Sequence, residues 1–135
     1  MIGHYVAVVP LRISHWILNA AIEVHRTLGG PGLLESVYEE ALVWELSRGG
    51  LQVQRQLLVP IIYKGIELAT NLRLDLLVEG LVIVECKATY RYTDIFAVQT
   101  LTYLRQLNLK LGIVINFGER LVTQGFHRVV NGLQA

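Results

Sequence analysis

One apolar stretch with charges inside it restricts the fold of this chain more than any other feature. Residues 71–90 have the sequence NLRLDLLVEGLVIVECKATY, which a Glu-Gly pair divides into two runs rich in Leu, Val and Ile. Such runs around a short turn predict two neighbouring strands in the middle of a sheet. Asp75, Glu85 and Lys87 interrupt these runs. An unpaired charge is costly to bury, so these side chains require one another, other partners or a bound ion.

The turn between the two strands decides whether the three charges can share a face. Glu85 and Lys87 point to the same side of their strand because strand side chains alternate. A two-residue turn at 79–80 puts Asp75 on the opposite side, whereas a three-residue turn over 78–80 puts it on the same side, one diagonal step from Glu85. Convergence of the charges therefore predicts an odd-length turn or a bulge.

Hydrophobic periodicity predicts the other elements. Apolar residues at helical spacing predict two helices, separated by the sequence GGPG, and Ser14 is a candidate N-cap of the first. A period near two then predicts a strand that bends at Pro60. The predicted helices cover residues 14–28, 33–48 and 94–108, and the predicted strands cover 51–65, 66–78, 81–88, 109–118 and 125–130. The order α-α-β-β-β-α-β-β predicts an α/β (α+β) fold in one domain over 1–135, with a mixed sheet flanked by helices.

Composition excludes several classes of protein. The net charge is +1, so any contact with nucleic acid must use a local basic patch, for which Arg73 and Arg91 are candidates. The single cysteine, Cys86, excludes an intrachain disulfide and a multi-cysteine metal cluster. A mean hydropathy of +0.44 predicts an apolar surface that a second copy covers, and thus a homodimer. We expect neither a signal peptide nor a membrane span. The expected location is therefore the cytoplasm.

The charges in the hairpin are compatible with a metal site. The carboxylates of Asp75 and Glu85, with the backbone carbonyl of Cys86, are oxygen ligands that suit Mg²⁺ or Mn²⁺. Lys87 beside such a cation can orient or deprotonate an attacking water. This combination is typical of metal-assisted hydrolysis of a phosphodiester.

The same charges are also compatible with a purely structural network. In this interpretation Lys87 neutralises Glu85, and Asp75 pairs with Arg73 or Arg91. Structural ion pairs gather charges as readily as functional sites do. The spacing D-x(9)-E-x-K therefore leaves both interpretations open.

Ordered motifs extend from about residue 17 to the last predicted strand. GLLESVY at 32–38 fits G-x-x-E-x-x-Y; AAIEVHRTLGGPG precedes it, and RLDLLV, VIVECKA, QTLTYLR and LGIVINFG follow. Together these motifs closely resemble the prokaryotic GxxExxY protein family, within the PD-(D/E)XK nuclease-like superfamily. The resemblance implies a restriction-endonuclease-like core of order α-β-β-β-α-β, to which the first helix is an addition.

The resemblance also implies roles for the charged residues. Glu35 would be the helical acid that approaches the metal directly or through water. Asp75 would be the central metal ligand, and Glu85 and Lys87 would form the E-x-K pair.

Two further positions follow from the same resemblance. Gln99 would face the site from the helix after the hairpin, and Tyr38 would hydrogen-bond Glu35 or the substrate. The family often has a histidine and an acidic residue shortly before that glutamine, where this chain has Phe96 and Ala97. An accessory acid–base or ligand role for that helix is therefore not expected here.

Two functions from different classes remain at this point. The first is a nuclease that uses Mg²⁺ or Mn²⁺ and acts on nucleic acid, DNA rather than RNA by family analogy. The second is a nuclease-fold module that binds nucleic acid or protein with little or no turnover. The near-neutral charge and small size favour the second function, whereas the intact acids and lysine argue against a degenerate site. A protein partner that supplies specificity is a further expectation.

Overall fold

A single five-stranded sheet organises the molecule. The computed structural model describes the backbone of residues 2–132 and the side chains of residues 9–132, so the ends of the predicted domain, 1 and 133–135, lie outside it. The strands lie in the order β1-β2-β3-β4-β5, with bounds β1 (Val53–Tyr63), β2 (Ile66–Val78), β3 (Val82–Lys87), β4 (Leu111–Asn116) and β5 (Phe126–Val130). All neighbours are antiparallel except β3 and β4, which are parallel. A parallel pair needs a crossover connection, which a helix supplies here.

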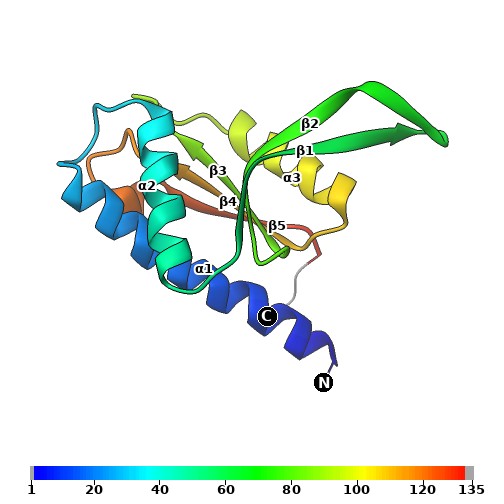
Figure 1. Cartoon of the computed structure of the whole chain (residues 1–135), viewed down its shortest axis with the longest axis horizontal. Coiled ribbons are helices and arrows are strands. Elements are labelled where there is room, and N and C mark those ends of the chain that lie inside the picture. Colours follow the sequence, from blue (N-terminus) through cyan, green and yellow to red (C-terminus); the bar gives the residue numbers. More distant parts are fainter. Residues whose placement is uncertain (1, 133–135) are drawn as a thin grey trace.

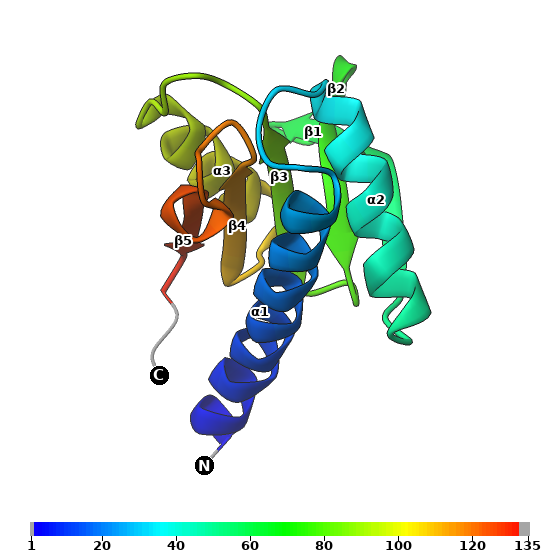
Figure 2. The same ribbon diagram turned by 90° about the vertical axis from the view of Figure 1, so that its left-hand side faces the viewer.

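Helices cover both faces of the sheet. α1 (Ile2–Thr27) and α2 (Glu35–Arg48) lie on one face, and α3 (Ile95–Leu107), the β3–β4 crossover, lies on the other, as Figure 1 and Figure 2 show. A short 3-10 helix, η1 (Val122–Gly125), precedes β5. This mixed fold and its element order confirm the prediction from periodicity. No helix in the described part of the chain is long and apolar enough to cross a membrane.

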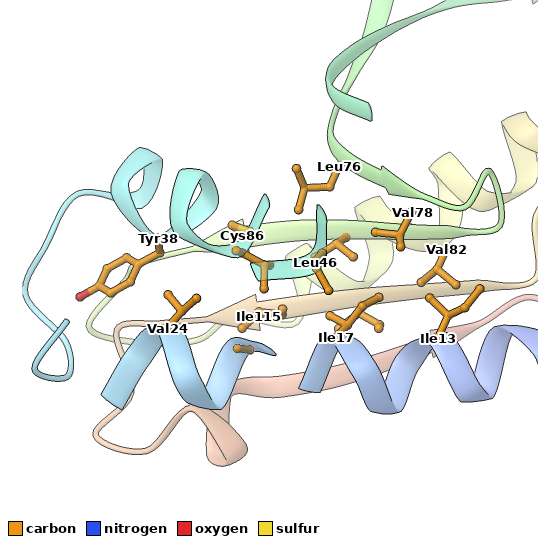
Figure 3. Close-up of a cluster of buried hydrophobic side chains, with 14 of the residues drawn as sticks. Ile13, Ile17, Val24, Tyr38, Leu46, Leu76, Val78, Val82, Cys86 and Ile115 are labelled. Carbon is orange, nitrogen blue, oxygen red and sulfur yellow. The ribbon is translucent and has the colours of Figure 1, made fainter. Parts of the chain in front are cut away.

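The larger core lies between the sheet and the α1–α2 layer. Figure 3 shows side chains of α1, among them Ile13, Ile17 and Val24, that point toward the sheet. They pack with Val82 and Ile115 from the two central parallel strands, and all five are buried. A smaller cluster on the other face packs α3 against the sheet through Leu104. The two buried layers hold β3 between them, which explains why its first three residues, Val82–Val84, are all apolar and buried.

The first helix is longer than predicted. It begins at Ile2 and continues through Pro10, although proline removes one backbone hydrogen bond from a helix. Val9 extends the apolar stripe of Ile13 and Ile17 toward the N-terminus, and it packs against the same core. The prediction that Ser14 caps the helix is wrong: Ser14 is buried in mid-helix, and its hydroxyl accepts a hydrogen bond from Nε of Arg128.

The β1–β2 hairpin extends beyond the helical layers as a long arm (Figure 1). Its far half is mostly exposed on both strands. The pairing register shifts after Pro60, which confirms the predicted bend. Nearer the body, the arm changes faces: Val53 packs on the α1–α2 side, whereas Leu57 and Leu74 pack on the α3 side. Gln56 lies at this change and has a φ of +52°, a backbone conformation that a side chain rarely adopts.

The turn between β2 and β3 has the predicted odd length. Val78 pairs with Val82, which leaves the three residues 79–81 in the turn, one position later than predicted. The same register places Asp75 directly opposite Glu85 rather than one diagonal step away. The central acid and the first residue of the E-x-K pair are therefore neighbours across the two strands.

Candidate active site

The site begins where β2 and β3 separate. Their ladder ends with the pair Leu76–Val84. At the next position the backbone N–H of Asp75 donates to Oε2 of Glu85 at 2.8 Å, and the N–H of Cys86 donates to Oδ2 of Asp75 at 2.8 Å. Buried backbone N–H groups need acceptors, and here two carboxylates supply what strand carbonyls would supply in a continued ladder. These two hydrogen bonds hold the carboxylates of Asp75 and Glu85 side by side.

The surroundings of the two carboxyl groups disfavour their ionised forms. Glu85 is only 5% exposed. Burial raises the pKa of Glu85 to about 8, and the charge of Asp75 adds to the increase, while Lys87 acts in the opposite direction. Burial also raises the pKa of Asp75, and the hydrogen bond from Cys86 offsets part of this rise. A bound cation would favour the ionised form of both acids.

Lys87 is near the acids without forming an ion pair. Among the side chains that the structure describes, no ion pair within 4.0 Å joins Lys87 to Glu85 or Asp75 to an arginine. The ion pairs that a purely structural network would use are therefore not formed among these side chains. Nζ of Lys87 lies 4.9 Å from the ring centroid of Phe96, within the range of a cation–π contact. Its charge lowers the pKa of both Glu35 and Glu85, so the ammonium group faces the site.

Helix α2 brings two more acids to the site. Glu35 is its first residue, and Glu39 lies one turn later on the same side of the helix. Partial burial raises the pKa of Glu35, with Lys87 acting against the increase and Asp75 and Glu39 adding to it. Glu35 is exposed to solvent, so it is the acid that water or a substrate reaches most easily.

Sequence reasoning missed the role of Glu39. Its carboxylate is 4% exposed and accepts from Nε of Arg55 at 2.7 Å and from the amide of Gln56 at 2.9 and 3.1 Å. The same amide of Gln56 lies 3.5 Å from Oδ1 of Asp75. Gln56 thus connects the helical acid to the strand acid, and its unusual φ aims the amide between them. The position of Glu39 four residues after Glu35 was a visible signal, whereas nothing in the sequence distinguished Gln56.

Helix α3 presents a mixed face to the site. Phe96 and Tyr103 lie two turns apart, and Gln99 lies between them on the same side. Burial raises the pKa of Tyr103, and the charges of Glu85 and Asp75 raise it further. Gln99 is exposed and therefore accessible to a bound substrate. Sequence reasoning missed Tyr103, which looked like an ordinary core aromatic.

The predicted role of Tyr38 is wrong. Its side chain is fully buried, and its hydroxyl donates to the carbonyl of Gly30 at 2.7 Å and accepts from the N–H of Leu33 at 3.1 Å. It therefore anchors the loop before α2 and does not bond Glu35. The predicted substrate contacts Arg73 and Arg91 are exposed, on β2 and in the loop after β3 respectively. Neither side chain is anchored in the acid cluster, since no ion pair joins it there.

The donors fit a small, hard cation completed by water. No three His, Cys, Asp or Glu side chains among the described residues are arranged to hold a metal ion by themselves. Mg²⁺ usually binds one or two carboxylates and keeps several waters. Asp75, Glu85 and the adjacent backbone carbonyl of Cys86 are the oxygen donors that such a cation would use.

A comparison with known families agrees with this geometry. The sequence profile described as the PD-(D/E)XK nuclease superfamily matches residues 11–129. No curated protein and no solved structure matches the chain.

Proposed function

The chain belongs to the PD-(D/E)XK nuclease superfamily, and from this premise we propose that it hydrolyses phosphodiester bonds in nucleic acid with the help of Mg²⁺ or Mn²⁺. The supporting observation is the pair of hydrogen bonds that holds Asp75 and Glu85 together where β2 and β3 separate. When bound, the cation would make an attacking water more acidic and offset the negative charge that builds up on the phosphate.

The residues of the chain have distinct roles in this proposal. Asp75 and Glu85 hold the cation with the carbonyl of Cys86, and Glu35 contacts its water shell. The ammonium group of Lys87 orients the attacking water. It also stabilises the negative charge that develops on the scissile phosphate. Water then forms the new P–O bond as the bond to the leaving oxygen breaks, and the chain is cut into two ends.

Gln99 and Glu35 complete the assignment. Gln99 donates hydrogen bonds to the phosphate from α3. Glu35 is the exposed member of the acid cluster, where water reaches it, and partial burial raises its pKa. Glu35 therefore receives the proton of the attacking water.

Four finer points belong to the same proposal. The chain is a GxxExxY protein, because Gly32, Glu35 and Tyr38 fit that pattern. DNA is the substrate rather than RNA, by analogy with the family. The protein forms a homodimer, and a protein partner supplies specificity, because a net charge of +1 gives little general attraction to nucleic acid.

Nicking of supercoiled plasmid with Mn²⁺ or Mg²⁺ tests the proposal. Asp75→Asn keeps an acceptor for the N–H of Cys86 but removes the charge, and Lys87→Ala removes the ammonium group. Both variants should lose cleavage, while Lys64→Ala, at the far end of the β1–β2 arm, should retain it. If the wild type cleaves neither plasmid, linear duplex nor single-stranded DNA with either cation, the hydrolytic function is refuted and a non-catalytic binding module takes its place.

A further inference from the structure

A cavity of about 480 Å³ lies next to the segment that follows Lys87. It lies beyond the C-terminal end of β3, where Ala88 follows Lys87, and the backbone of Ala88 also interacts with Glu35. A strand of nucleic acid with its phosphate at Lys87 therefore has this cavity as its neighbour. The lining residues that matter here are Gly32, Ala88, Thr89, Tyr90, Gly118 and Arg120.

One wall of the cavity is fixed by a buried asparagine. Asn116 ends β4 and is fully buried. Its Oδ1 accepts from the backbone N–H groups of Thr89 and Gly118, each at 3.0 Å, and its Nδ2 donates to the carbonyl of Thr89 at 3.1 Å. A Cβ atom at Gly118 would lie 2.1 Å from the carbonyl oxygen of Thr89, so only glycine permits this close approach. The loops after β3 and β4 are thus held together as one surface.

The opposite wall is fixed by a tyrosine. Tyr38 bonds Gly30 and Leu33, the residues on either side of the segment that lines the cavity. Its ring stacks on Phe117, with centroids 4.7 Å apart and planes 4° from parallel. Because Phe117 directly precedes Gly118, the two walls are braced against each other. The cavity is therefore preformed rather than assembled by a ligand.

The rim of the cavity carries a cation and a free aromatic ring. Arg120 is exposed and also lines a second cavity of about 460 Å³ on the other side of Gly30. Tyr90 is 91% exposed. Tyr92, two residues later, differs because its ring already stacks on His127 at 4.0 Å. A guanidinium group suits a phosphate and an exposed ring suits the face of a base, so the rim has the two groups that single-stranded nucleic acid requires.

We propose that this cavity binds an unpaired nucleotide of the substrate strand, next to the phosphate that is cut. Arg120 contacts the phosphate of that nucleotide, and Tyr90 stacks on its base. This assignment rests on the proposed nuclease function and specifies its substrate class. A base within a duplex has both faces covered by its neighbours, so a strand that is single, overhanging or frayed at this position binds better.

Binding to a protein that cannot cleave tests the assignment. Fluorescence anisotropy with Lys87→Ala protein and Mn²⁺ gives the Kd for a duplex with a single-stranded overhang and for a blunt duplex of equal length. Tyr90→Ala and Arg120→Gln are combined with Lys87→Ala, and the controls are Tyr63→Ala on the β1–β2 arm and Arg48→Gln at the end of α2. All four positions are exposed, and thermal melting checks that each variant is folded.

We expect the overhang to bind more tightly than the blunt duplex. Tyr90→Ala should weaken binding of the overhang about tenfold and leave blunt-duplex binding unchanged, since one base–aromatic stack is lost. Arg120→Gln should reduce the slope of log K against log salt by about 0.7, as expected for one lost phosphate contact. Tyr63→Ala should leave the affinity for the overhang unchanged, and Arg48→Gln should leave the salt slope unchanged.

Three results would overturn the assignment. The first is equal affinity for overhang and blunt duplex, and the second is a Tyr90→Ala variant that binds like Tyr63→Ala. If either occurs while the Lys87-containing protein still nicks plasmid, the nuclease function stands and only the cavity is assigned wrongly. The third, no binding and no cleavage of any of these nucleic acids, removes both proposals together.

Discussion

The buried carboxyl group of Glu85 should make the stability of the cation-free protein depend strongly on pH. Its pKa is raised from 4.5 to about 8 because it is buried and lies beside Asp75. The folded protein therefore holds a proton that the unfolded chain releases above pH 4.5. The stability from this group is fully present below the unfolded pKa and is lost as pH rises through the folded one.

The magnitude follows from the two pKa values. Between pH 5.5 and 7.5 the free energy of unfolding should fall by about 1.4 kcal/mol per pH unit, or roughly 2.5 kcal/mol in total. For a chain of this size that corresponds to a decrease in Tm of about 10 °C. The raised pKa values of Asp75 and Glu35 act in the same direction.

Urea unfolding at a series of pH values, with EDTA present, measures this dependence. Glu85→Gln is the matched control, because an amide oxygen can still accept from the N–H of Asp75 but does not titrate. The difference in stability between wild type and Glu85→Gln should therefore change with pH by the amount given above. Two parallel curves would refute the reasoning, since they would mean that Glu85 is ionised in the folded protein without a cation. Mn²⁺ at pH 7.5 should restore stability to the wild type, by about 2.7 kcal/mol at a hundred times its Kd.

Substitutions at three positions test the groups around the acids. Arg55→Ala removes the ion-pair partner of the buried Glu39 and should destabilise the protein by about 2 kcal/mol, measured by urea unfolding; an unchanged midpoint would mean that Gln56 alone satisfies this acid. Gln56→Gly should be more stable than Gln56→Ala by about 1 kcal/mol because of the positive φ, yet both should slow plasmid nicking roughly tenfold or more through a misplaced Asp75. Equal stability of the two would contradict strain at this position. Tyr38→Phe keeps the stacked ring but loses both loop hydrogen bonds, so Tm should fall by an amount equivalent to about 1–2 kcal/mol, and no decrease would show that the loop is anchored elsewhere.

The sequence predicted the order of elements because each element has a clear period. The apolar run of β3 and the alternation of the neighbouring strands indicated a central hairpin, and the need to bring Asp75 to Glu85 predicted its odd turn. The start of α1 was less predictable. Ser14 looked like a cap because serine favours that position, but the helix continues N-terminal of both Ser14 and Pro10, and Val9 and Leu11 pack against the core.

The charged residues of the candidate site were predictable because they stand within an apolar run. The residues that reach the site from other elements were not predictable from the sequence. Glu85 and Lys87 were conspicuous in their strand. Gln56 and Tyr103 were not, because their relation to the acids depends on how β1 turns at one residue and how α3 lies on the sheet. The prediction for Tyr38 failed for a similar reason. Tyr38 lies one turn after Glu35 in the helix, but its hydroxyl donates to the carbonyl of Gly30 in the preceding loop.

Asp75 and Glu85 can be preserved for two different reasons, catalysis or folding, because both accept hydrogen bonds from the backbone. Both carboxylates terminate a strand ladder, so selection for folding alone would preserve them in a descendant that had lost all turnover. The side chain of Lys87 has no such structural duty, since its ammonium group forms no hydrogen bond or ion pair with the described residues and lies over the ring of Phe96. In distant copies of this fold, the lysine is therefore the more informative residue: its replacement beside two intact acids marks a protein that keeps the architecture after its chemistry has gone.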